Sequence, residues 1–197
     1  MNAYARPRPP FLIVALIALS VVASLPTLGS VENVLTPLLI ASPGSQGFTD
    51  VLHGEVWRLV TPILVHFGVL HILFNMMWLW DLGGSLERLR GAAFVGLFVV
   101  TAAIASNVAQ YAIAGNPYFG GMSGVVYAML GYVWMRGRRD PAFGIALQSG
   151  TVMMMLAWYV LCWTGLLGPI ANWAHTAGLL LGVAWGAFER VRIAGHL

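Results

Sequence analysis

Four polar residues stand in strongly apolar surroundings, where such side chains are rare. Ser123 lies in "GGMSGVVYAML" and His175 opens "HTAGLLLGVAWG". A histidine that takes the proton of a serine makes it a nucleophile, so this pair predicts attack on a carbonyl group if the two side chains meet. His71 and Asn75 are four residues apart in "HILFN" and share one helix face. Both can donate hydrogen bonds to an oxyanion, together with the Ser123 backbone N–H.

Each of these residues also has a purely structural interpretation. Ser123 could be the N-cap of the helix that it begins. His175 could bond to a neighbouring carbonyl, and the two donors of "HILFN" could join helices as polar contacts. The flanking Gly121 and Gly124 favour the reactive interpretation, because glycine lets the chain turn sharply and lets another helix or a substrate come close.

Glycines mark the helix face on which His175 lies. Gly178, Gly182 and Gly186 follow it at +3, +7 and +11 and form a stripe. Small residues at this spacing let membrane helices approach closely, so the helix that packs on the stripe also meets the imidazole. If that helix is the one beginning at Ser123, a serine–histidine hydrogen bond becomes possible.

Zinc proteolysis is the competing chemistry, and its support is the pair His66 and His71. The sequence has no His-Glu-x-x-His motif, and a separation of five residues puts two side chains about 140° apart on a helix. Cys162 is the single cysteine, so the chain can form neither an internal disulfide nor a cysteine-based zinc cluster. We expect Cys162 to be a buried apolar residue, and we expect no metal and no cofactor.

Asp81 is the acidic residue that falls within a predicted membrane span and could complete a triad. It lies ten residues beyond His71, which is roughly 15 Å along a helix. That distance is too great for its carboxylate to orient His175. We therefore expect a two-residue dyad.

The chain that positions these residues has the composition of an integral membrane protein. Of its 197 residues 59% are hydrophobic and 9% are charged, with a mean hydropathy of +0.80, whereas a soluble domain is about 25% charged. Apolar runs that predict spanning helices cover residues 11–29, 67–86, 92–114, 122–135, 149–164 and 171–189. The sequence predicts an all-α six-transmembrane-helix bundle that forms one domain over 1–197, without a separate soluble domain. The first run could be a signal peptide, but no clear small-x-small cleavage site ends it, and we expect a retained helix.

Arginine positions predict the orientation of the bundle. Nine of the ten arginines stand at helix ends that six spans place on one side, which is the cytoplasm, and both termini lie there too. These nine are Arg6, Arg8, Arg88, Arg90, Arg136, Arg138, Arg139, Arg190 and Arg192. The net charge of +3 and the pI near 9.4 thus indicate topology rather than nucleic acid binding. The tenth, Arg58, falls in the long segment 30–65, which we expect to be a loop partly embedded in the membrane.

The polar residues share one predicted depth. Counted from the first charged residue after each run, all four lie roughly 18–24 Å above the cytoplasmic boundary of a ~30 Å core. The run from Ser123 to Arg136 is too short to cross the bilayer, so non-helical backbone before it must reach membrane depth. Such backbone is stable only inside protein or beside a water-filled cavity, which predicts a water-accessible site below the outer surface.

On these motifs the sequence resembles the rhomboid family of intramembrane serine proteases, in its compact bacterial six-helix form. The matching elements are "EVWR" at 55–58, "HFGVLHILFN" at 66–75, "GMSG" at 121–124 and "AHTAGLLLG" at 174–182. They follow the family's order over about residues 50–190.

The resemblance implies that Ser123 is the nucleophile and His175 the general base and later acid, with Tyr127 stacked on the imidazole. It implies an oxyanion hole formed by His71, Asn75 and the Ser123 amide. It further implies supporting residues around the dyad and a side gate for substrate between the second and fifth helices. The supporting residues are Glu55, Trp57, Arg58, His66, Gly121 and Gly124, and the gate residues are Phe74 and Trp158. Asp81 departs from the aromatic or apolar residue that the family has at its place.

We therefore expect an endopeptidase that cleaves transmembrane segments of other membrane proteins in the inner (cytoplasmic) membrane of a bacterium. Its partners would be those substrates and the lipid bilayer, and not nucleic acid; the sequence leaves its oligomeric state open. One alternative is a catalytically inactive rhomboid-like protein that binds membrane clients, which should lack the serine or the histidine. Another is a transporter or channel, which should carry polar residues through the whole membrane thickness.

Overall fold

The computed structural model describes residues 9–28 and 32–189, and within these ranges the chain forms helices and no strands. The α-helices are α1 Phe11–Ser24, α2 Thr49–Leu52, α3 Val69–Trp78, α4 Gly84–Arg90, α5 Ala92–Ala114, α6 Ser123–Arg139, α7 Ser149–Trp163 and α8 Asn172–Phe188. The 3-10 turns are η1 Leu25–Leu28, η2 Glu32–Leu38, η3 Val56–Leu59, η4 Thr61–Leu64 and η6 Pro141–Phe143, and η5 Leu79–Gly83 is a π-helical turn. The prediction of an all-α protein is confirmed.

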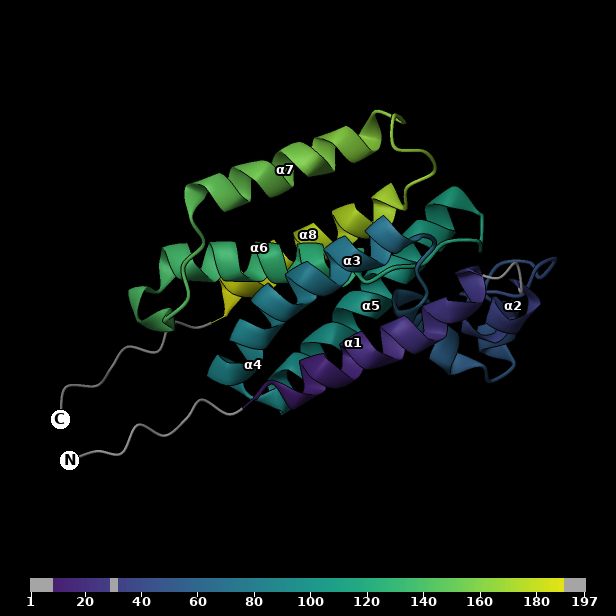
Figure 1. Cartoon of the computed structure of the whole chain (residues 1–197), viewed down its shortest axis with the longest axis horizontal. Coiled ribbons are helices and arrows are strands. Elements are labelled where there is room, and N and C mark those ends of the chain that lie inside the picture. The colour runs from purple at the N-terminus through teal and green to yellow at the C-terminus, as the bar shows by residue number, and fades with distance from the viewer. Residues whose placement is uncertain (1–8, 29–31, 190–197) are drawn as a thin grey trace.

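The long helices run side by side, and each reverses the direction of the one before it along the chain (Figure 1). Helices α6 and α8 are neighbours at the centre and therefore run the same way. Helices α3, η5 and α4 follow one another as one continuous rod. Helix α7 lies along one edge of the bundle, apart from α5 and α1 (Figure 1). Among the described residues, α5 is the helix that is by itself long and apolar enough to cross a membrane.

Helix α8 packs directly on the backbone of α6. A Cβ added to Gly178 would lie 2.0 Å from the carbonyl oxygen of Gly124, and one added to Gly182 would lie 1.9 Å from that of Ala128. A Cβ on Gly186 would meet the Tyr132 carbonyl oxygen at 2.7 Å. The glycine stripe is therefore the surface that brings the two helices into backbone contact, as small residues do in membranes.

Arg136 and Glu87 are first charged residues after predicted membrane spans, from which the depth of the polar residues was counted. Their side chains do not face water. Arg136 and Glu87 are 4% and 8% exposed, and Arg136 donates to Asp140 at 2.7 Å and to the Glu189 carbonyl at 3.1 Å. Helix α6 therefore continues past the predicted end of the 122–135 run to Arg139. Its 17 residues give a length of about 25 Å, rather than the roughly 21 Å counted from the sequence.

The Glu87 carboxylate caps the first helix. Its two oxygens accept the backbone N–H groups of Leu12 and Ile13, each at 2.9 Å. The first N–H groups of a helix have no partner within it, and a carboxylate also interacts favourably with the positive end of the helix dipole. Glu87 thus fixes the start of α1 against the end of α4.

The arginines predicted to mark the cytoplasmic side have varied surroundings. Arg6, Arg8, Arg190 and Arg192 lie outside the described residues. Arg90 forms an ion pair with Glu189 at 2.6 Å and also hydrogen bonds to Tyr132, which itself donates to Glu189 at 2.6 Å. This network ties the ends of α4 and α8 to the middle of α6.

Arg58 is buried and organises the segment before α3. It pairs with Glu55 at 2.5 Å and donates to the carbonyl oxygens of Thr36 at 2.6 Å and Leu39 at 2.9 Å. The Trp57 indole donates to the Pro37 carbonyl at 3.1 Å. A buried guanidinium needs such acceptors, so this arginine holds the loop folded.

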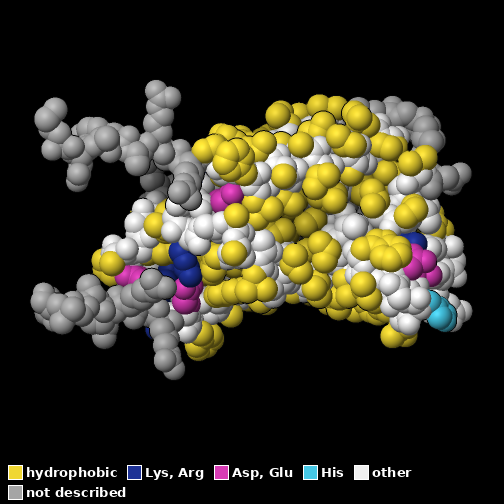
Figure 2. Space-filling model, turned by 90° about the horizontal axis from the view of Figure 1, so that it is seen from below, with side chains coloured by type: hydrophobic (Ala, Val, Ile, Leu, Met, Phe, Trp, Pro, Cys, Tyr) yellow, Lys and Arg dark blue, Asp and Glu magenta, His cyan; other side chains and the backbone are white. Residues whose placement is uncertain are grey.

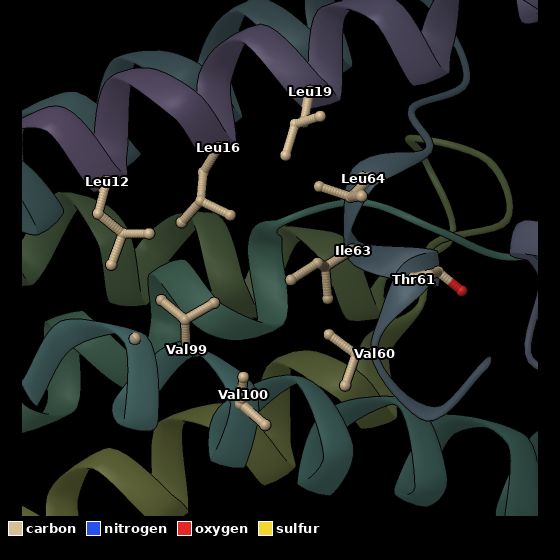
Figure 3. Close-up of a pocket in the computed structure, with 10 residues that line it drawn as sticks. Leu12, Leu16, Leu19, Val60, Thr61, Ile63, Leu64, Val99 and Val100 are labelled. Atoms are coloured by element: carbon tan, nitrogen blue, oxygen red, sulfur yellow. The ribbon is translucent and has the colours of Figure 1, made fainter. Parts of the chain in front are cut away.

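The surface has a broad apolar band. On the face shown in Figure 2, hydrophobic side chains cover the middle of the molecule, and charged side chains gather toward its two ends. An apolar cavity of about 160 Å³ lies between α1, η4 and α5 (Figure 3). It is lined by Leu12, Leu16, Leu19, Val60, Thr61, Ile63, Leu64, Gly96, Val99 and Val100. Helix α1 therefore leaves a gap beside η4 where its packing on α5 is incomplete.

Candidate active site

Ser123 and His175 are joined by a hydrogen bond. Ser123 is the first residue of α6, and its Oγ lies 2.8 Å from Nε2 of His175, which stands in the first turn of α8. The structural interpretation of Ser123 as an N-cap is wrong, because Met122 occupies the cap position and no side chain caps this helix. The serine hydroxyl is instead directed at the imidazole.

The imidazole of His175 is enclosed, with the residue only 5% exposed. The Tyr127 ring lies against it, with the ring centroids 4.8 Å apart and the planes at 38°. Nδ1 of His175 is buried without a hydrogen-bond partner in the part of the chain that the structure describes. Among the described residues no carboxylate contacts Nδ1 of this histidine, and a two-residue dyad stays a prediction.

The backbone leading to Ser123 is held by the segment before α3. The Gly121 N–H donates to the Pro62 carbonyl, and the Met122 N–H donates to Nε2 of His66, both at 3.1 Å. Nε2 of His66 is therefore the acceptor, which assigns the ring proton to Nδ1 beside the Leu64 carbonyl at 3.2 Å. His66 thus anchors the backbone immediately before the serine.

Residues of α1 and η1 secure His66 in turn. The Ser24 Oγ accepts the His66 backbone N–H at 3.0 Å and donates to the Ser20 carbonyl at 2.7 Å. The Thr27 hydroxyl donates to the Ser24 carbonyl at 2.6 Å and also lies 3.0 Å from the His66 carbonyl. Sequence reasoning missed these contacts, because a serine or threonine near the end of an apolar helix is ordinary.

Gly121 has the backbone conformation and the lack of space that only glycine allows. Its φ of +115° lies in the region that side chains rarely adopt, and an added Cβ would lie 2.7 Å from the His71 ring. The His71 ring also contacts His66, with centroids 5.1 Å apart. His71 is thus close to the turn into α6.

Asn75 uses its amide within its own helix. Its Nδ2 donates to the His71 carbonyl at 2.9 Å, and the residue is buried. In the described residues, neither His71 nor Asn75 hydrogen bonds to Ser123. The two predicted oxyanion donors lie four residues apart on α3, and the Asn75 amide is occupied by the His71 carbonyl in this conformation.

The predicted gate residues contact each other. Phe74 on α3 and Trp158 on α7 have ring centroids 6.0 Å apart, and each residue is 48% exposed. Gly124 directly follows the serine, and an added Cβ there would be 2.6 Å from the Ser106 hydroxyl. Asp81 is exposed on the π-helical turn η5, a turn that the sequence did not indicate.

Gln110 is a supporting residue that the sequence analysis missed. It is buried on α5, and its Oε1 accepts the N–H groups of Trp173 at 3.0 Å and Ala174 at 3.3 Å. The Trp173 N–H lies in the first turn of α8, where backbone donors lack a partner within the helix, and the Ala174 N–H also bonds to the Ala171 carbonyl at 3.1 Å. A glutamine inside an apolar run was the available signal, because a polar side chain at such a position needs a partner.

A comparison with protein families matches a rhomboid domain to residues 53–192. Curated proteins named rhomboid protease GlpG, from Salmonella paratyphi A and Salmonella choleraesuis, are each 48% identical to this chain over 138 residues. These residues are 70% of this chain and 50% of each relative. The chain therefore spans about half the length of the curated relatives it matches. It is an integral membrane protein, and it belongs to the rhomboid family.

Proposed function

We propose that this protein is an intramembrane serine endopeptidase that cleaves transmembrane segments of other membrane proteins. The observation that carries the proposal is the 2.8 Å contact between the Ser123 hydroxyl and the His175 imidazole. The relatives named as rhomboid proteases support the same class of reaction.

The first step is attack on a substrate carbonyl. Nε2 of His175 takes the proton of the Ser123 hydroxyl while Oγ bonds to the carbonyl carbon. The tetrahedral intermediate then collapses: the peptide C–N bond breaks, and Nε2 returns the proton to the leaving amine. A water molecule, deprotonated by the same nitrogen, attacks the resulting ester and releases the carboxylate product and the free serine.

The oxyanion would lie at the start of α6. The Ser123 backbone N–H is one of the first donors of that helix and has no partner within it, and the helix dipole favours negative charge there. The His71 ring beside Gly121 is a second donor. Asn75 becomes the third when its amide turns away from the His71 carbonyl. The geometry supports a hole that is completed when substrate binds.

Tyr127 and the enclosure of the site take the place of an orienting carboxylate. The tyrosine ring restricts the imidazole, and its hydroxyl donates to the Met155 carbonyl at 3.2 Å. The loop residues Glu55, Trp57 and Arg58 stabilise the fold beside the dyad, and His66 fixes the turn at Gly121. No metal or cofactor takes part in this mechanism.

We propose that six segments cross the membrane, namely α1, the rod from α3 to α4, α5, α6, α7 and α8. Their alternating directions support this topology, with the chain forming one domain in the inner membrane of a bacterium and with cytoplasmic termini. Ser123 then lies toward the outer side, where water can enter. Substrate enters between α3 and α7, past Phe74 and Trp158.

Suitable substrates are segments that unwind readily near the outer surface. The carbonyl groups of a transmembrane helix are hydrogen bonded within it, so Ser123 can reach a carbonyl only where the helix opens. Glycine, proline and small residues at the cut favour such opening. A catalytically inactive binder of membrane proteins is the alternative function, and the intact Ser123–His175 contact disfavours it.

Cleavage of a transmembrane peptide by the purified protein in lipid vesicles tests the proposal. Ser123→Ala and His175→Ala should each lower turnover more than about 10³-fold, because the nucleophile and the base act as a unit. Ser149→Ala is the matched control at an exposed helix start and should keep full turnover. Equal cleavage by wild type and Ser123→Ala, or no labelling of Ser123 by a fluorophosphonate, would contradict a serine protease.

A further inference from the structure

Helix α7 has few buried side chains with which to hold it to the bundle. It buries three of its side chains, those of Val152, Met155 and Cys162. The side chains of Met153, Met154, Trp158 and Val160 are about half exposed or more. Figure 1 shows α7 along the edge of the bundle, beside α6 and α8. The few polar contacts of α7 therefore bear strongly on whether it stays in place.

Among the described residues, three hydrogen bonds join α7 to other helices. Two of them end on its backbone: Tyr127 of α6 donates to the Met155 carbonyl at 3.2 Å, and Asn172 of α8 donates to the Cys162 carbonyl at 3.1 Å. The third, between the hydroxyls of Tyr159 and Thr176, is the shortest at 2.8 Å. It is also the one that joins two side chains.

The direction of the Tyr159–Thr176 bond follows from the second contact of Thr176. The Thr176 hydroxyl lies 2.9 Å from the Asn172 carbonyl and donates its proton there. It is therefore the acceptor for Tyr159, whose proton has no other acceptor among the described residues. When α7 moves away, the tyrosine hydroxyl loses its partner in apolar surroundings, where water does not readily replace it.

We propose that the Tyr159–Thr176 hydrogen bond is a latch that holds α7 against α8 and limits how often substrate can enter beside Ser123. Thr176 directly follows His175, and the Tyr159 ring contacts Tyr127, with centroids 5.8 Å apart. The latch thus joins the moving helix to the helix that carries the base. This inference rests on the proposed function, in which substrate passes between α3 and α7.

The single cysteine of the chain gives a direct measure of α7 movement. Cys162 lies on α7 and is 2% exposed, so it reacts with a maleimide only when the helix moves away. Its alkylation does not need Ser123 and can be followed in the Ser123→Ala protein. The position of α7 and the cleavage of substrate are therefore measured separately.

Tyr159→Phe and Thr176→Val remove the latch with little change in shape. Each should raise both the alkylation rate of Cys162 and kcat/KM for a transmembrane substrate by about threefold, the typical effect of one interhelical hydrogen bond in a membrane. The double variant should show no larger rise, because either change alone breaks the bond. Labelling of Ser123 by a small water-soluble fluorophosphonate should stay constant.

Three control variants separate the latch from general effects of these substitutions. Thr176→Ser keeps the hydroxyl and should behave as wild type. Thr101→Val removes a bond from a hydroxyl to the carbonyl four residues earlier, here Leu97 at 2.8 Å, without an interhelical contact. Tyr118→Phe changes an exposed tyrosine. Neither Thr101→Val nor Tyr118→Phe should change the alkylation rate of Cys162 on α7.

The outcomes distinguish the latch from the protease proposal. Unchanged alkylation of Cys162 in both Tyr159→Phe and Thr176→Val would overturn the latch. A rise in Cys162 alkylation without a rise in cleavage would overturn the idea that the latch controls substrate entry. A rise in fluorophosphonate labelling of Ser123 as large as the rise in cleavage would overturn it too. If the wild type cleaves nothing, the proposed function fails, and alkylation alone still decides whether the bond holds α7.

Discussion

Gly178→Ala should separate the two members of the dyad. An added Cβ would lie 2.0 Å from the Gly124 carbonyl oxygen, and ordinary contact begins at 3.4 Å. Backbone lies on both sides of this contact, so α8 must move from α6 by about 1.4 Å. His175 is one turn from Gly178, and its 2.8 Å contact with Ser123 would lengthen to about 4 Å, beyond hydrogen-bond distance.

The expected loss of turnover is about 10²-fold, the typical result of a 1 Å misplacement of reacting groups. The free energy of unfolding should fall by about 1–3 kcal/mol, as in other overpacked contacts. Both are measurable on the purified protein in lipid, by cleavage of a transmembrane peptide and by reversible unfolding. The rate of Ser123 labelling by a fluorophosphonate should fall along with turnover.

Gly150→Ala is the matched control for this substitution. A Cβ there meets no atom within 4 Å, so the change should leave turnover as it is. Gly186→Ala should lower turnover by less than Gly178→Ala. Its Cβ would lie 2.7 Å from the Tyr132 carbonyl oxygen, a milder overlap that is eleven residues along α8 from His175. Wild-type turnover in a folded Gly178→Ala protein would refute the idea that backbone contact between α6 and α8 sets the dyad distance.

Three further predictions concern charged residues. Asp81→Asn should keep turnover near the wild-type value, because Asp81 is exposed on η5; loss of turnover in the folded variant would show a catalytic role. Glu87→Ala should lower the free energy of unfolding by about 1–2 kcal/mol through loss of the α1 cap, and an unchanged unfolding midpoint would exclude that role. The Ser42 backbone N–H, at 2.6 Å, holds the pKa of Asp50 below its ordinary value. Asp50 therefore stabilises the loop above pH about 4 and less as the pH falls through its lowered pKa, so Asp50→Asn should destabilise the protein at pH 7, and the difference from wild type should shrink as the pH is lowered below about 4.

Periodicity and composition predicted the helices well, because a helix forms between residues that are close together in the sequence. The glycine stripe after His175 even indicated the face on which α8 packs. Helix ends were harder to predict, since a charged residue was assumed to face water. Arg136 instead bonds to Asp140 and to the Glu189 carbonyl, and the helix runs on.

The sequence indicated which residues to consider for a site, and Ser123 and His175 are in contact, but it could not predict how the side chains are oriented. Asn75 was expected to aim at an oxyanion, and its amide is bonded to the His71 carbonyl. Contacts between residues far apart in the chain were also missed, such as Glu87 with Leu12 and Gln110 with Trp173. A polar residue in an apolar run signals that a partner exists, while the identity of the partner depends on tertiary packing.

The bond between Ser24 and His66 has a consequence for how such chains can be recombined. The rhomboid match covers residues 53–192, and Ser24 lies before it. A chimera that joined this region to a first helix without a serine at the place of Ser24 would lack the hydroxyl that accepts the His66 N–H. The turn before Ser123 would then be held less firmly, although every residue of the dyad region was kept. The first helix is thus a structural part of the site, because its Ser24 holds the histidine that accepts the Met122 N–H.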